Sequence, residues 1–128
     1  MIVIDASAIV ELLLGGPKVR ALAPRIASED LHAPDLIDIE VLSALRRHES
    51  TGVTTAVAAT VAVHTLTRLA LTRHSCAPFA LRIWQLRANL STYDACYVTL
   101  AESIAAPLVT CDARIARAPG HRARVEVF

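Results

Sequence analysis

The sequence predicts an α/β fold in which a central, mostly parallel sheet is flanked by helices. Residues 2–4 form a short, wholly apolar run with β-branched side chains, which is typical of a strand buried on both faces of a parallel sheet. Further short runs, at residues 31–33 and 108–110, are separated by longer stretches with helical spacing. The length of 128 residues and the hydrophobic content of 54% indicate one packed domain that spans residues 1–128.

Helices are expected to occupy most of the first half of the chain. Ser7 can cap a helix that ends at the glycines and proline of residues 15–17. Pro34 and Asp35 begin a strong helix whose apolar positions recur with helical spacing. The stretch after Thr54 contains Thr and Val, which favour strands, but its alanines and its length favour a helix. The expected helices are residues 7–14, 18–28, 34–50 and 54–67.

The second half is expected to alternate between short strands and helices. A helix over residues 78–88 has Leu81, Trp84 and Leu86 on or near its buried side, so we interpret Trp84 as a core residue rather than a base-stacking platform. Ser91 can cap the helix that follows it. The other expected elements are a candidate strand at 69–71, a helix at 92–105, a strand at 108–110, a short helix after Asp112 and an edge strand at 125–128.

Four acidic residues lie where carboxylates are seldom found. Asp5 and Asp112 each end an apolar run, Asp94 stands at the head of an apolar helix, and Glu40 lies inside an apolar helical stretch. Carboxylates next to a core are normally paired or bound to a metal, and no basic residue occupies a matching place in the sequence.

These four acids can converge at one edge of the predicted sheet. Asp5 and Asp112 follow strands directly, and ligands of parallel α/β sheets bind beyond the carboxyl ends of the strands. Helices that follow strands begin at the same edge, with Asp94 in a first turn and Glu40 roughly 7 Å along another helix. Asp38, two positions before Glu40, is expected to point toward solvent. Convergence requires that the strands carrying the acids are neighbours.

A converged set of carboxylates predicts a divalent cation. Two carboxylates about 5 Å apart repel each other by roughly 3 kcal/mol at an effective dielectric constant near 20. Oxygen-only ligation fits Mg²⁺ or Mn²⁺, and such an ion activates water for attack on a phosphodiester. Each acid also has a structural explanation: Asp5, Asp94 and Asp112 can cap helices, and Glu40 can belong to an ion pair. A cation site accounts for all four together.

Other features exclude several classes of function. The formal net charge of +1 provides no large basic field, the 5 histidines lack zinc-ligand spacing, and no glycine-rich nucleotide-binding loop is present. The 3 cysteines show no CxxC spacing and are expected to be reduced core residues. Asp5 interrupts the apolar start too early for a signal peptide, and we expect no membrane span. A cytoplasmic location is therefore predicted.

The ordered acids, with the residues around them, resemble the PIN-domain nucleases and, within these, the VapC toxins of bacterial toxin–antitoxin pairs. The similarity covers nearly the whole chain and is weakest over residues 51–77. The matching stretches are residues 2–8, 33–36 through Glu40 to residue 47, 84–95 with Tyr97 and residues 100–102, and 110–114.

The resemblance implies a three-layer PIN-like sandwich and an Mg²⁺- or Mn²⁺-dependent endoribonuclease that cleaves RNA and stops translation. By the family pattern, Asp5 and Asp94 are direct metal ligands, and Glu40 and Asp112 complete the site directly or through water. It also implies a homodimer and a VapB-type antitoxin whose tail occupies the active-site groove.

Several further residues are candidates for substrate contact. Ser7 is placed to touch a metal-bound water, unless it only caps its helix. Phosphate contacts are expected from basic side chains near the predicted site, although exposed arginines are common. These candidates are Arg73, Arg82, Arg87 and Arg114.

Four alternative functions are considered. A response-regulator receiver needs an acidic pair after its first strand and a late lysine, whereas Lys18 is the only lysine here. A haloacid-dehalogenase-type phosphatase needs an aspartate where Ser7 stands. A non-catalytic, metal-stabilised binding domain and a DNA-directed nuclease of the same fold both remain open, because metal-assisted cleavage does not depend on the 2′-hydroxyl.

Overall fold

The computed structural model describes all residues from 1 to 128, and a five-stranded sheet lies at its centre. The strand order is β3-β2-β1-β4-β5, and every neighbouring pair is parallel. This confirms the predicted parallel α/β sheet. The strands are β1 (Ile2–Ile4), β2 (Leu31–Pro34), β3 (Leu71–His74), β4 (Leu108–Thr110) and β5 (Val125–Val127).

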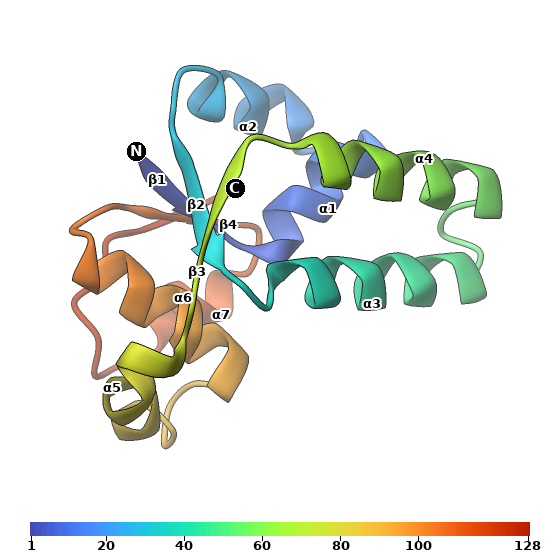
Figure 1. The fold of residues 1–128 in the computed structure, drawn as a ribbon. Helices are drawn as coiled ribbons and strands as arrows, with labels where there is room; N and C mark the ends of the chain where they lie inside the picture. The colour runs from blue at the N-terminus through green and yellow to red at the C-terminus, as the bar shows by residue number, and fades with distance from the viewer.

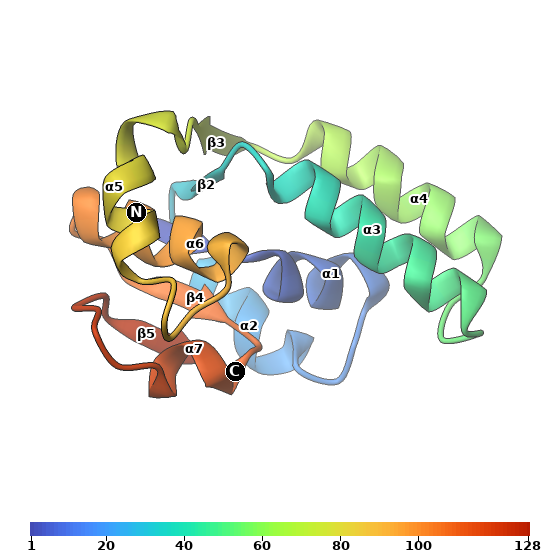
Figure 2. The same cartoon turned by 90° about the horizontal axis from the view of Figure 1, so that it is seen from below.

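Helices cover both faces of the sheet, which gives three layers. Figure 1 shows the sheet nearly edge-on, with α1, α3 and α4 on one side and α5 and α6 on the other. The antiparallel pair α3 and α4 extends well beyond the sheet (Figure 2). The helices are α1 (Ala6–Leu14), α2 (Val19–Ile26), α3 (Ile37–Ser50), α4 (Ala56–Arg68), the 3₁₀ turn η1 (Ala77–Phe79), α5 (Ala80–Gln85), α6 (Thr92–Ser103) and α7 (Ala113–Arg117).

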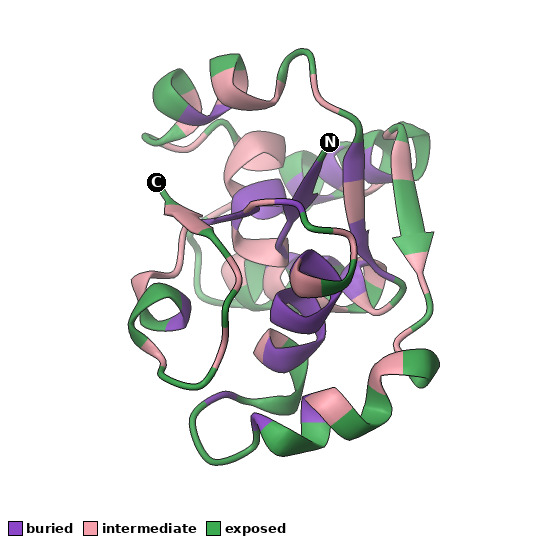
Figure 3. Cartoon of the chain, turned by 90° about the vertical axis from the view of Figure 1, so that its left-hand side faces the viewer, coloured by how far each residue is buried: buried purple, intermediate pink, exposed green.

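The core is built around β1, β4 and α6. All three residues of β1 are buried, as a central strand covered on both faces requires. Helix α6 packs on β1, β2 and β4 and buries seven consecutive residues, from 95 to 101, because other elements surround it. Buried residues gather at the centre of the molecule, and the peripheral ribbon is exposed or intermediate (Figure 3).

Several element boundaries differ from the sequence prediction, and three of the differences have a clear structural cause. Helix α1 is capped by Asp5 and not by Ser7, because the Asp5 side chain accepts the backbone N–H of Ala8. Helix α3 begins at Ile37 rather than at Pro34, because Pro34 still belongs to β2 and the N–H of Asp35 bonds to the carbonyl of His74. Strand β3 begins at residue 71 rather than 69, because α4 continues to residue 68.

The predicted buried side of the 78–88 helix is wrong at two positions. Leu81 is 81% exposed and Trp84 is 65% exposed, whereas Ile83 and Leu86 are buried. All four side chains are apolar, so periodicity alone does not select the inward face of so short a helix. Trp84 is therefore not a core residue, and the guanidinium of Arg87 lies 4.6 Å from its ring centroid.

No helix of the chain combines the length and the apolar character needed to cross a membrane.

Candidate active site

One cavity of about 600 Å³ brings the four predicted acids together. Strands β1 and β4 are neighbours, with Ile4 in register with Val109, so Asp5 and Asp112 leave the sheet at the same edge. Asp94 enters from the first turn of α6 and Glu40 from α3. The condition for convergence, adjacency of the strands that carry two of the acids, is therefore met.

Asp5 is held by three hydrogen-bond donors and by no cation. The side chain is 5% exposed. Its Oδ1 accepts the hydroxyl of Ser7 at 2.7 Å and the N–H of Ala8 at 2.9 Å, and its Oδ2 accepts the hydroxyl of Thr110 at 2.6 Å. Burial raises the pKa of Asp5, the three donors act in the opposite direction, and the charge of Asp112 adds to the rise.

Ser7 and Thr110 connect the ends of the two central strands around Asp5. The Oγ of Ser7 also accepts the N–H of Cys111 at 2.9 Å, and the Oγ1 of Thr110 accepts the N–H of Asp112 at 2.8 Å. Each hydroxyl therefore donates to Asp5 and accepts from the backbone after β4. Such paired bonds fix the orientation of a carboxylate, which a ligand site requires.

Glu40 has a single hydrogen-bond partner, the hydroxyl of Tyr97, which donates to Oε2 at 2.5 Å. Burial raises the pKa of Glu40, the Tyr97 bond opposes the rise, and the charges of Asp94 and Asp5 increase it. Burial and the bond to Glu40 raise the pKa of Tyr97, so its hydroxyl remains a neutral donor. No cation pairs with Glu40, and the alternative explanation as an ion pair is therefore wrong.

Asp94 and Asp112 combine helix capping with a place in the cavity. Ser91 caps α6: its Oγ accepts the N–H of Asp94 at 3.0 Å and donates its hydroxyl to Oδ2 of Asp94 at 2.8 Å. Asp112 caps α7 and forms an ion pair with Arg114, which lowers the pKa of Asp112. At both positions, helix capping is therefore compatible with a role as a metal ligand.

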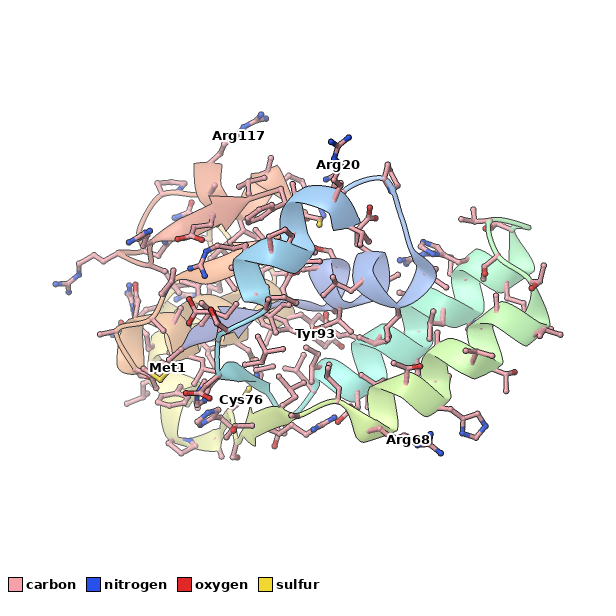
Figure 4. All side chains as sticks on the ribbon, turned by 90° about the horizontal axis from the view of Figure 1, so that it is seen from above. Met1, Arg20, Arg68, Cys76, Tyr93 and Arg117 are labelled. Atoms are coloured by element: carbon pink, nitrogen blue, oxygen red, sulfur yellow. The ribbon has the colours of Figure 1, made fainter.

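Of the predicted substrate contacts, only Ser7 and Arg114 line the cavity. The guanidinium of Arg73 pairs with Asp38, whose side chain is partly exposed and lies outside the cavity. Arg82 pairs with Glu102, and Arg87 lies over Trp84. We therefore do not retain Arg73, Arg82 and Arg87 as residues of this site. The surface arginines Arg20, Arg68 and Arg117 project outward from the periphery (Figure 4).

The cavity also contains residues that the sequence reasoning missed. Arg47 follows Glu40 by seven residues, or two helical turns, so its place on the same face of α3 could have been predicted. Glu11 is an acid within the apolar helix α1, which is the same setting that makes Glu40 a candidate site residue. Tyr97 lies three residues after Asp94 on the same face of α6, but its bond to Glu40, like the bond of Thr110 to Asp5, crosses from one element to another and could not be predicted from local spacing.

The donor set fits a hard divalent cation. The acids of the cavity offer carboxylate oxygens as ligand atoms, which suit Mg²⁺ or Mn²⁺. No three His, Cys, Asp or Glu side chains are close enough together to form a ready-made metal cage. Mg²⁺ typically takes one or two carboxylates directly and completes its shell with water and substrate phosphate. Asp5 and Asp94 can supply such direct ligands, with Glu40 nearby.

The fold and the cavity define a parallel α/β domain with an acidic site at the carboxyl ends of its strands. Residues 2–121 match the PIN domain. Ribonuclease VapC12 of Mycobacterium tuberculosis is 40% identical over 127 residues, which cover 99% of this chain and 98% of that protein. The chain therefore belongs to the PIN-domain family and, within it, to the VapC ribonucleases.

Solved structures share the same fold. VapC20 of Mycobacterium tuberculosis, a toxin that cleaves the sarcin-ricin loop, has a TM-score of 0.71 at 15% identity, covering 95% of this chain and 97% of that one. VapBC2 of Rickettsia felis, bound to a DNA fragment from its promoter, has a TM-score of 0.70 at 16% identity, covering 100% of this chain and 99% of that chain. Both likenesses cover nearly the whole chain and show a shared fold.

Proposed function

We propose that residues 1–128 act as one nuclease domain, a metal-dependent endoribonuclease that serves as the toxin of a type II toxin–antitoxin pair. The observation that carries the proposal is the convergence of Asp5, Glu40 and Asp94 in one cavity without any side-chain cation within ion-pair distance. The 40% identity to a ribonuclease over 99% of the chain supports RNA as the substrate.

Asp5 and Asp94 would hold Mg²⁺ or Mn²⁺ directly, and Glu40 and Asp112 would complete the site directly or through water. The bound ion supplies an activated water and neutralises charge on the phosphate. Ser7 and Thr110 keep both oxygens of Asp5 in a fixed orientation. Arg47, His48 and Arg114 form the basic part of the cavity wall and would bind the phosphates on either side of the cleaved bond.

The family also bears on partners. VapBC2 of Rickettsia felis is a complex of toxin with antitoxin. We infer that this chain is inhibited by a VapB-type antitoxin, whose tail occupies the cavity groove, and that it forms a homodimer. Cleavage of RNA in the cytoplasm would then inhibit translation once the antitoxin is lost.

The proposal is tested by mapping new 5′ ends in total bacterial RNA after incubation with purified, antitoxin-free protein and Mn²⁺. Discrete ends made by the wild type, but not by Asp94→Asn or in EDTA, are expected. A parallel incubation with single-stranded and duplex DNA tests a DNA-directed nuclease. Mn²⁺ binding without cleavage of either nucleic acid would contradict the proposal and support a metal-stabilised binding domain.

A further inference from the structure

A hydrogen bond connects two helices across the proposed metal site. Tyr97 follows Asp94 by three residues on α6, so both side chains lie on the same face of the helix, and both line the cavity. The Tyr97 side chain is 2% exposed, and its hydroxyl reaches Oε2 of Glu40 on α3 at 2.5 Å. A buried phenol usually needs a polar partner, and here that partner is a predicted site residue.

Glu40 depends on this bond for its orientation. Its long side chain has no ion-pair partner, and Oε1 has no hydrogen-bond partner within the protein. Asp5, in contrast, is fixed by three donors. Without the hydroxyl of Tyr97, the carboxylate of Glu40 would be free to rotate away from Asp5 and Asp94.

We propose that Tyr97 is a positioning residue that holds Oε2 of Glu40 and leaves Oε1 available to the divalent cation or to its bound water. The inference rests on the proposed function, because it assumes that the cavity binds a metal ion. Partners that orient a ligand in this way typically change metal affinity by about 10- to 100-fold.

Calorimetric titration of metal-free protein with Mn²⁺ tests the role of Tyr97. We expect Tyr97→Phe, which removes only the hydroxyl, to weaken binding about tenfold. Thr99→Val is the matched control, because Thr99 is a buried residue two positions further along α6 whose hydroxyl has no partner. This variant is expected to bind Mn²⁺ like the wild type, and thermal unfolding checks that all variants are folded.

Two further variants show whether Tyr97 acts through Glu40. Glu40→Asp retains a carboxylate but withdraws it by one methylene, and it is expected to weaken Mn²⁺ binding by a similar factor. In a Glu40→Gln background, Tyr97→Phe should have no additional effect. Cleavage by Tyr97→Phe should fall at limiting Mn²⁺ and recover at saturating Mn²⁺, which a general loss of folding would not produce.

Several outcomes would overturn the inference. Unchanged or tighter Mn²⁺ binding by Tyr97→Phe would overturn it. So would a finding that Tyr97→Phe weakens Mn²⁺ binding in the Glu40→Gln background as much as it does in the wild type. If the wild type binds Mn²⁺ and cleaves RNA while Tyr97→Phe is indistinguishable from it, only the role of Tyr97 fails. If the wild type neither binds Mn²⁺ nor cleaves RNA, the proposed function fails as well.

Discussion

Glu40 and Glu102 are both partly buried glutamates on helices, but their carboxylates have opposite surroundings. Glu102 accepts two bonds from the guanidinium of Arg82 and one from the N–H of Arg122, and Arg82 lowers its pKa. Glu40 receives one neutral hydroxyl and faces Asp94 and Asp5, and burial raises its pKa. The negative charge of Glu102 is therefore balanced by an arginine, whereas that of Glu40 has no positive partner.

The difference extends to other acids of the molecule. Glu29 and Glu126 both pair with Arg25, whereas Asp5 and Asp94 pair with no cation. The chain has 13 Lys and Arg for 12 Asp and Glu, so a shortage of cations does not explain the pattern. Four acids without an ion-pair partner, namely Asp5, Glu11, Glu40 and Asp94, line one cavity, where a divalent ion can supply positive charge.

The largest expected effect is the loss of cleavage when a cavity acid is neutralised. Asp94→Asn removes one oxygen ligand at nearly constant volume, and we expect RNA cleavage to fall by more than about a hundredfold, beyond what loss of a supporting partner causes. The measurement is the initial rate on a mapped RNA at fixed Mn²⁺. Asp38→Asn is the control, because Asp38 pairs with Arg73 outside the cavity. Equal cleavage rates for Asp94→Asn and wild type would mean that the unpaired acids of the cavity are no more important for cleavage than the acids paired with arginine.

The second prediction concerns stability without metal. The pKa of Asp5 is raised above 3.8 in the folded protein, so the folded state holds this proton more tightly than the unfolded state. The stability that the protonated form contributes is therefore fully present below the unfolded pKa and is lost as the pH rises through the folded pKa. We expect Asp5→Asn to melt a few degrees higher than wild type at pH 7 in EDTA. The gain should disappear near pH 3, and Mn²⁺ should stabilise only the wild type.

Glu102→Gln is expected to have the opposite effect on stability. The pKa of Glu102 is lowered below 4.5 in the folded state, so its contribution is present above the unfolded pKa and is lost as the pH falls through the folded value. Loss of the pair with Arg82 should reduce the free energy of unfolding by about 1 kcal/mol at pH 7. Denaturant titration at pH 7 and pH 3 measures the difference, which should shrink at the lower pH. A Glu102→Gln variant more stable than wild type at pH 7 would contradict a stabilising ion pair between Glu102 and Arg82.

The smallest effect is expected at the pair between Asp38 and Arg73. The two side chains are 34% and 32% exposed, and water screens such a pair. Asp38→Asn should change the free energy of unfolding by at most about 0.5 kcal/mol, as measured by denaturant titration. A larger loss would mean that this pair fixes the start of α3, and Asp38 would no longer serve as a neutral control.

The sequence predicted the parts of the molecule that depend on local pattern. The apolar run of β1 and the Ser91 cap both specify their elements directly, and the rule for parallel sheets placed Asp5 and Asp112 at one edge. The inward face of α5 was not predictable, because Leu81 and Ile83 are equally apolar and only tertiary packing separates them.

Long-range side-chain contacts were beyond local pattern. The hydroxyl of Thr110 reaches an acid 105 residues earlier in the chain, and that of Tyr97 reaches one 57 residues earlier. Arg73 and Arg82 were assigned to phosphate because their acidic partners could not be identified without the fold. The ligand residues could thus be proposed from the sequence, whereas the hydroxyl groups that orient them required the structure.

The most direct test of the cation site is a calorimetric titration of Mn²⁺ into metal-free wild type, Asp5→Asn, Asp94→Asn and Glu102→Gln. The unpaired acids of the cavity predict saturable binding to wild type and to Glu102→Gln, with binding lost or strongly weakened in both aspartate variants. Identical isotherms for all four proteins, or no binding to wild type, would contradict the account of the cavity as a divalent-cation site.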